Sequence, residues 1–362
     1  MRASGEAVEL KIDLQSRGVR AADVAASGAR RGGAGPADGI TLFFDDLVTT
    51  VPTAAAFVER SPFTLQAAGD KTVLTRGGRE LREVEVAGRP AFYSRVGAGG
   101  VPLEKVALRH GLDGIGSTVA QGCGRREPCL FCGISLSAKA GTTLARKSPR
   151  DVGDAAAAAL DEGFSHIVLT TGTPNLDDCG VPLLASCAEA VKSRTGGKMK
   201  VHVQFEPPTD DTWIQQAAAF ADTAAINMEC FDAATLARVA PGKAALGPPR
   251  FERAWTRAVE AMGEGRVACF VIVGLGEPRR SVIEACRLLT SLGVFPYVLP
   301  LRPIPGTPLG QAHPPAAAEM LSLYQEAARV ISASRISKAD SMVAGCVRCG
   351  ACSAITDVLE EE

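Results

Sequence analysis

The 362-residue sequence contains few aromatic residues and few histidines, and its net charge is close to zero. These features exclude some classes of function. Aromatic residues make up 5% and the net charge is −1, so no basic surface with interleaved aromatic side chains is predicted, which argues against nucleic-acid binding. No apolar run reaches the ~18 residues that span a bilayer. The first residues lack the apolar core of a secretory signal. We therefore expect a cytoplasmic protein without nucleic-acid or membrane partners.

Cysteine stands out against these shortages, because the chain holds eleven cysteines and four histidines. Two short groups lie within residues 123–132 and 346–352, and the other cysteines are scattered. In a reducing compartment, grouped cysteines are more often metal ligands and scattered ones are small core residues. Cys269 in "VACFVIVG" and Cys286 in "IEACRLL" are therefore predicted to lie in the core.

The composition divides the chain into four parts. Residues 1–38, which include "GARRGGAGPADG", are Gly-rich and predict an irregular lead-in. Residues 39–111 hold short alternating runs and a hairpin signal in "EVEVAGRPAFYS", which predict a small β-rich N-terminal domain. Residues 112–312 form the largest part, and residues 313–362 carry a last helix and a cysteine-rich C-terminal extension.

Strand-like and helix-like segments alternate six times between residues 112 and 312. The strand-like runs are "GSTVAQ", "HIVLTTG", "KVHVQFE", "AAINMEC", "VACFVIVG" and "FPYVLPL". Helical patterns follow them, as in "SPRDVGDAAAAALDEG", where Ser148 is placed to cap the helix and Pro149 to begin it. Six βα units in series predict a parallel sheet, so the expected fold class is α/β, a partial (β/α)6 TIM-like barrel.

Polar residues gather where these runs end, which is the edge at which such barrels place their active sites. His202, Gln204 and Glu206 fall on one face of the third run, and Asn227 and Glu229 on one face of the fourth. Such a set is typical of a lined cavity. The alternative for each residue is a satisfied polar group at a strand end.

Three cysteines follow the first run directly. Cys123, Cys129 and Cys132 are spaced C-x5-C-x2-C. Tetrahedral zinc and [4Fe–4S] clusters both normally take four protein ligands. With three thiolates, one iron of a cluster stays open for a small molecule, which is the arrangement of a catalytic site. A structural zinc loop is the alternative.

A three-cysteine loop after the first strand of a six-unit barrel resembles the radical S-adenosylmethionine (SAM) superfamily. That superfamily usually has C-x3-C-x2-C, and this chain keeps the second half. "TGT" stands where the superfamily has Gly-Gly-Glu, while "NMECF", "FVIVGLGE" and "LRPIPGTPL" resemble later motifs of its biotin-synthase-like branch. The resemblance covers residues 112–310. It implies SAM contacts at Phe131, Thr171, Gly172, Thr173, Glu206, Asn227, Glu229, Ile272 and Gly274.

The resemblance also implies a reaction. A reduced [4Fe–4S] cluster on Cys123, Cys129 and Cys132 would cleave SAM into methionine and a 5′-deoxyadenosyl radical, which takes hydrogen from a small, amino-acid-like substrate. Glu206 would hold SAM or substrate, and Arg302 would clamp a substrate carboxylate. An electron donor such as flavodoxin or ferredoxin would reduce the cluster.

The second cysteine group also supplies three ligands, one fewer than a cluster or a zinc ion normally takes. Cys346, Cys349 and Cys352 are spaced C-x2-C-x2-C, the opening of a ferredoxin-type run without its fourth cysteine. We expect an auxiliary [4Fe–4S] cluster with an open iron, or with Cys179 or Cys230 as fourth ligand. A zinc site completed from elsewhere and a metal-free tail are the alternatives.

Both cysteine groups, the Gly-rich lead-in and the β-rich segment together are similar to radical SAM proteins encoded in bacterial nitrilase gene clusters, which implies a role in nitrile- or cyanide-related nitrogen metabolism. Two other functions stay open. One is an iron–sulfur electron carrier or scaffold without SAM chemistry. The other is a radical enzyme that transfers a 3-amino-3-carboxypropyl group.

Overall fold

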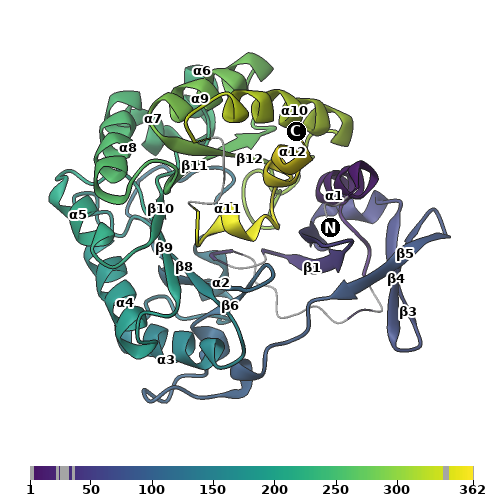
Figure 1. The fold of residues 1–362 in the computed structure, drawn as a ribbon, viewed down its shortest axis with the longest axis horizontal. Coiled ribbons are helices and arrows are strands. Elements are labelled where there is room, and N and C mark those ends of the chain that lie inside the picture. Colours follow the sequence, from purple (N-terminus) through teal and green to yellow (C-terminus); the bar gives the residue numbers. More distant parts are fainter. Residues whose placement is uncertain (1–3, 22–23, 25–31, 35–36, 337–341, 362) are drawn as a thin grey trace.

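The computed structural model describes residues 4–21, 24, 32–34, 37–336 and 342–361 and contains two sheets (Figure 1). The five-stranded antiparallel sheet consists of β1 (Gly39–Phe44), β2 (Leu47–Pro52), β3 (Phe63–Ala68), β4 (Lys71–Arg76) and β5 (Arg79–Val86). The seven-stranded sheet consists of β6 (Leu108–His110), β7 (Gly114–Ala120), β8 (His166–Thr171), β9 (Lys200–Gln204), β10 (Thr223–Ala225), β11 (Val267–Val273) and β12 (Val294–Pro300). The expected α/β fold with an N-terminal β-rich part is confirmed at this level.

The larger sheet curls into a half-barrel with helices outside it (Figure 1). Its strands follow chain order, with β7 to β12 paired in parallel and β6 antiparallel to β7. Every residue of β7 is buried, as expected of a strand covered on both faces. The helices that alternate with these strands are α2 (Leu136–Lys139), α3 (Pro149–Leu160), α4 (Val181–Arg194), α5 (Thr212–Ala218), α6 (Ala233–Val239), α7 (Pro241–Leu246), α8 (Pro248–Met262), α9 (Arg279–Ser291) and α10 (Ala317–Ser332).

The hairpin expected in "EVEVAGRPAFYS" is wrong. The first half of that stretch is β5, but Ala91–Ser94 forms a 3-10 turn, η2, because Pro90 has no N–H for a ladder. Two further 3-10 turns are η1 (Ala56–Arg60) and η3 (Leu103–Lys105). The hairpin that joins β4 to β5 turns at Gly77 and Gly78, both with positive φ, as a two-residue primed turn requires.

The lead-in is also less irregular than expected, since Gly5–Arg17 forms helix α1. Ser4 caps it by accepting from the backbone N–H of Ala7, and its buried residues join the main core. Much of "GARRGGAGPADG" lies outside the described residues. The boundaries of the four predicted parts stay predictions.

The C-terminal segment returns to the half-barrel. Helix α11 (Cys346–Cys349) lies inside the ring of strands, and α12 (Ile355–Glu361) lies beside α1 (Figure 1). The buried Lys11 of α1 forms a 2.6 Å ion pair with Asp357 of α12. This pair joins the two ends of the chain next to the cysteine-bearing α11. In the part of the chain that the structure describes, no helix is long and apolar enough to cross a membrane.

Candidate active site

The first cysteine loop follows β7 at the carboxyl end of the half-barrel strands, as predicted. Its backbone is held from three sides. Gly124 N–H donates to the carbonyl of Thr173, after β8, at 2.6 Å, and Leu130 N–H donates to that of Val239, in α6, at 2.8 Å. The Leu130 carbonyl in turn accepts from Leu309 N–H at 3.0 Å. Loops from distant parts of the chain therefore position the cysteines.

All eleven cysteines, each within the described residues, are free thiols. Cys123 and Cys132 are exposed and Cys129 is half-buried. Burial raises the pKa of Cys129 to about 12, although the nearby Lys243 ammonium opposes the shift. Burial likewise raises the pKa of Cys132. Binding to a cation is what would draw such thiols into the thiolate form.

The widened gap of the cysteine motif carries a functional group that sequence reasoning missed. Arg125, inside "GRREP", donates through Nε and Nη2 to Glu206 Oε2 at 2.7 Å and 2.5 Å. The two side chains are 10% and 15% exposed, so this is a shielded ion pair. The pair connects the cysteine loop to the end of β9.

Glu206 also belongs to the "TGT" segment. Burial opposes its ionisation, yet Lys243, Arg125 and a hydrogen bond with Thr173 hold the pKa of Glu206 below its usual value. The segment lies close against the cysteine loop, since a Cβ on Gly172 would sit 2.0 Å from the carbonyl oxygen of Gly122. Only glycine permits this approach. The structure thus brings together the predicted cysteines, Thr173 and Glu206.

A second ion pair joins Glu229 to Lys243. The sequence predicts Glu229 as a site residue but does not identify Lys243. Lys243 Nζ of α7 binds the Glu229 carboxylate and donates to the Asn227 carbonyl at 2.7 Å. Glu229 has φ of +74°, a strained conformation for a non-glycine residue and one that collects at functional sites. Burial raises the pKa of Glu229 despite Lys243. The charge of Lys243 also acts on Cys129.

The remaining predicted SAM positions line the neighbouring strand ends. The Asn227 side chain accepts from Phe270 N–H at 3.0 Å, which fastens the end of β10 to β11. Ile272 is largely buried on β11, and Gly274 follows with φ of +103°. Gly274 N–H donates to the Glu277 carboxylate at 2.9 Å. Phe131 is partly buried against the core.

Arg302 lies beside the N-terminal sheet and the second cysteine group. It donates to the Thr50 carbonyl of β2. It also lies near Cys352: burial raises the pKa of this thiol, and the positive charge of Arg302 opposes that rise. The second cysteine group is itself inside the half-barrel. Cys346 Sγ accepts from Gln204 Nε2 at 3.6 Å and contacts His110 Nε2 at 3.9 Å.

The two cysteines considered as a fourth ligand for this group point elsewhere. Cys179 Sγ donates to the Pro207 carbonyl at 3.5 Å, and Cys230 Sγ donates to the Asp232 carbonyl at 3.7 Å. Across the described ranges, no three His, Cys, Asp or Glu side chains converge on a point as they do around a single metal ion. A cubane cluster holds its thiolates farther apart, because each one binds a different iron.

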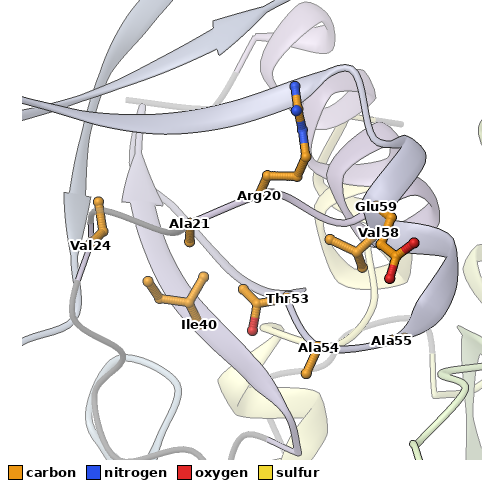
Figure 2. Close-up of a pocket in the computed structure, with 9 residues that line it drawn as sticks. All are labelled: Arg20, Ala21, Val24, Ile40, Thr53, Ala54, Ala55, Val58 and Glu59. Carbon is orange, nitrogen blue, oxygen red and sulfur yellow. The ribbon is translucent and has the colours of Figure 1, made fainter.

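A cavity of about 610 Å³ lies in the N-terminal part (Figure 2). Small and apolar residues such as Ala21, Ile40 and Val58 line most of it, with Arg20 and Glu59 as its charged groups. No cysteine or histidine is among its lining residues. Its lining therefore offers no donor set for a cluster.

No family model matches the sequence. The chain is 23% identical over 342 residues to bacteriochlorophyllide c C-7(1)-hydroxylase of Chlorobaculum limnaeum, covering 86% of this chain and 81% of that protein. Among solved structures, a radical SAM methyltransferase from Sphaerobacter thermophilus aligns with a TM-score of 0.47 and 17% identity over 75% of this chain and 76% of that one. Methylornithine synthase aligns with a TM-score of 0.45 and 16% identity, over 60% of this chain and 61% of the synthase.

Proposed function

We propose that the chain is a radical SAM enzyme that cleaves SAM at a [4Fe–4S] cluster held by Cys123, Cys129 and Cys132. One observation carries this proposal. Three free thiols stand on a loop that is fastened to neighbouring strand ends, between the Arg125–Glu206 and Lys243–Glu229 ion pairs. The donor set fits a cluster with one open iron, because the loop supplies three thiolates rather than four.

When bound and reduced, the cluster and SAM supply a 5′-deoxyadenosyl radical that takes a hydrogen atom from the substrate. The protein's own task is to hold the charges around it. Lys243 offsets the negative charge of the Cys129 thiolate. Arg125 occupies one oxygen of Glu206 and so aims the other, which we assign to an N–H or O–H of SAM or substrate.

The predicted SAM positions keep their roles in this proposal. Thr171, Gly172 and Thr173 lie against the cysteine loop and are assigned to the methionyl amino group. Asn227, held by Phe270 N–H, and Glu229 are assigned to ribose. Adenine is assigned to Phe131, Ile272 and Gly274. The contact between Gly172 and Gly122 supports the first role, because it puts this backbone beside the cysteines.

We assign a small, amino-acid-like molecule as substrate, a flavodoxin or ferredoxin as electron donor and a cytoplasmic location. The role in nitrile- or cyanide-related nitrogen metabolism rests on the sequence resemblance alone. Arg302 was predicted to clamp a substrate carboxylate. We keep that role for Arg302, whose position near Cys352 supports a clamp beside the second cysteine group, and we assign an auxiliary cluster to Cys346, Cys349 and Cys352.

Anaerobic incubation of the reconstituted protein with SAM and dithionite tests the proposal. We expect release of 5′-deoxyadenosine and methionine. The variant with Cys123, Cys129 and Cys132 all changed to Ala should release neither, whereas Cys187→Ala, a buried thiol in α4, should retain cleavage. Cleavage by the triple variant would refute the assignment. Product mass separates this reaction from transfer of a 3-amino-3-carboxypropyl group.

A further inference from the structure

The second cysteine group has a protein environment built around it. Cys346 and Cys349 are 8% and 5% exposed, and two polar side chains of the half-barrel contact Cys346. Gln204 of β9 donates to Cys346 Sγ at 3.6 Å, and His110 of β6 contacts the same sulfur at 3.9 Å. Cys349 Sγ donates to the His110 carbonyl at 3.8 Å.

Two polar atoms at this place lack partners although water does not reach them. His110 Nδ1 and Tyr297 Oη are buried and have no hydrogen-bond partner within the described part of the chain. His110 is 8% exposed and Tyr297 is 1% exposed. The charges of all three cysteines act on the Tyr297 phenol, whose pKa burial raises well above its usual value. Buried polar groups are normally paired, so two unpaired ones beside three thiols indicate a missing ligand.

The surroundings also favour a negatively charged group. Lys11 is fully buried in α1, where it pairs with Asp357 at 2.6 Å, and a Cβ on Gly350, the residue after Cys349, would sit 3.9 Å from Lys11 Nζ. Arg302 donates to the Thr50 carbonyl, and Thr50 N–H donates to the Ala351 carbonyl, so this guanidinium also lies beside the cysteine-bearing segment. A cluster with three thiolates carries net negative charge, which such cations stabilise.

From these contacts we infer that His110 is the fourth ligand of the auxiliary cluster, so that Cys346, Cys349, Cys352 and His110 close its coordination. This inference rests on the auxiliary cluster assigned above. One ring nitrogen of His110 touches Cys346 and the other is unpartnered, so a nitrogen is free for iron in either ring orientation. Imidazole replaces thiolate on iron in Rieske centres.

Tyr297 is a hydrogen-bond donor in this proposal and not a ligand. With a cluster bound, its phenol would be available to donate a hydrogen bond to a cluster sulfur, as Gln204 donates to Cys346, and such a bond would raise the reduction potential of the cluster. With all four positions filled by the chain, the auxiliary cluster exchanges electrons and does not chelate the substrate. In this proposal His110 takes the position that the sequence left to an open iron, to Cys179 or to Cys230.

The test uses the full chain with Cys123, Cys129 and Cys132 changed to Ala, so that only the second site is filled on anaerobic reconstitution. We expect about four irons with matching sulfide per chain. Pulsed EPR of the reduced protein should show 14N coupling from a directly bound nitrogen. His110→Ala should abolish that coupling and added imidazole should restore it. The exposed His313→Ala is the control.

His110→Cys guards against loss of folding, because it offers a fourth thiolate. It should keep the irons, lose the 14N coupling and lower the reduction potential. Three results would each overturn the inference. They are no 14N coupling in the variant that lacks the first three cysteines, 14N coupling that survives His110→Ala, and binding of one zinc ion without sulfide. SAM cleavage by the wild-type protein is scored separately, so failure of that assay with intact coupling refutes only the first-site proposal.

Discussion

Gln204, the last residue of β9, and Glu206, two residues later, each bind a different cysteine-bearing segment. Gln204 Nε2 donates to Cys346 Sγ at 3.6 Å, while Glu206 pairs with Arg125 of the first loop at 2.5 Å. Two residues of a strand advance about 7 Å. The two cysteine groups are therefore neighbours inside one half-barrel, and β9 connects them.

The Arg125–Glu206 pair predicts a cost for neutralising Arg125. Arg125→Met should slow SAM cleavage at least tenfold, about 1.4 kcal/mol of barrier, because Glu206 loses the group that orients it. Arg125→Lys should restore part of the rate, since Lys supplies the charge without the fork. The measurement is 5′-deoxyadenosine formed per minute. Its control is Arg126→Met, which alters an exposed neighbour in the same loop. Equal rates in the two Met variants would contradict the role.

The Lys243–Glu229 pair predicts strong coupling between its members. Lys243→Met should lower the free energy of unfolding by about 3 kcal/mol or more, because a carboxylate is left buried without its cation. Glu229→Gln alone should also destabilise. The double variant should recover part of the loss, and urea unfolding of all four proteins without clusters measures the coupling. Additive losses would show that the two side chains do not interact.

A glycine next to the second cysteine group allows a matched test of that site. Gly111 has φ of +69°, and a Cβ there would sit 2.2 Å from Cys349 Sγ. Gly111→Ala should therefore displace Cys349 and remove the irons of the second site while the first site keeps its own. Gly69→Ala is the control, because Gly69 has φ of +68° and nothing within 4 Å of the added Cβ. Iron and sulfide counts that are equal in both variants would refute the prediction.

His202 predicts loss of stability in acid. It is buried among His110 and His166 and bonded to Thr223 Oγ1 at 2.8 Å, and burial lowers its pKa to about 3. An unfolded histidine has a pKa near 6.5, so between these values the unfolded chain binds the extra proton and stability falls as pH falls. At pH 5.5 this group should cost about 1.4 kcal/mol relative to pH above 7.

Urea unfolding of the cluster-free protein at pH 7.5 and 5.5 measures this effect. His202→Asn should lose about that much of the pH dependence, whereas His313→Asn at an exposed site should keep it. An unchanged slope in His202→Asn would place the acid sensitivity in another group. His166, whose pKa burial also lowers, is the next candidate.

Local patterns in the chain predicted much of the fold. The apolar runs became β7 to β12 in chain order, and Ser148 caps α3 by accepting from Asp151 N–H, as its position before Pro149 indicated. Cys269 and Cys286 are wholly buried. The failures were local as well: a proline ended the expected hairpin, and a short amphipathic helix was hidden in a Gly-rich lead-in.

The sequence by itself determined the order of strands and helices, the grouping of cysteines and the edge where polar residues collect. These follow from periodicity and from short-range spacing, which a linear chain displays directly. Only the tertiary structure decided the partners: Arg125 with Glu206, Lys243 with Glu229, and Cys346 with His110, 236 residues away. Such pairs depend on how sheet curvature and the returning C-terminus place distant segments together, and no local pattern encodes that geometry.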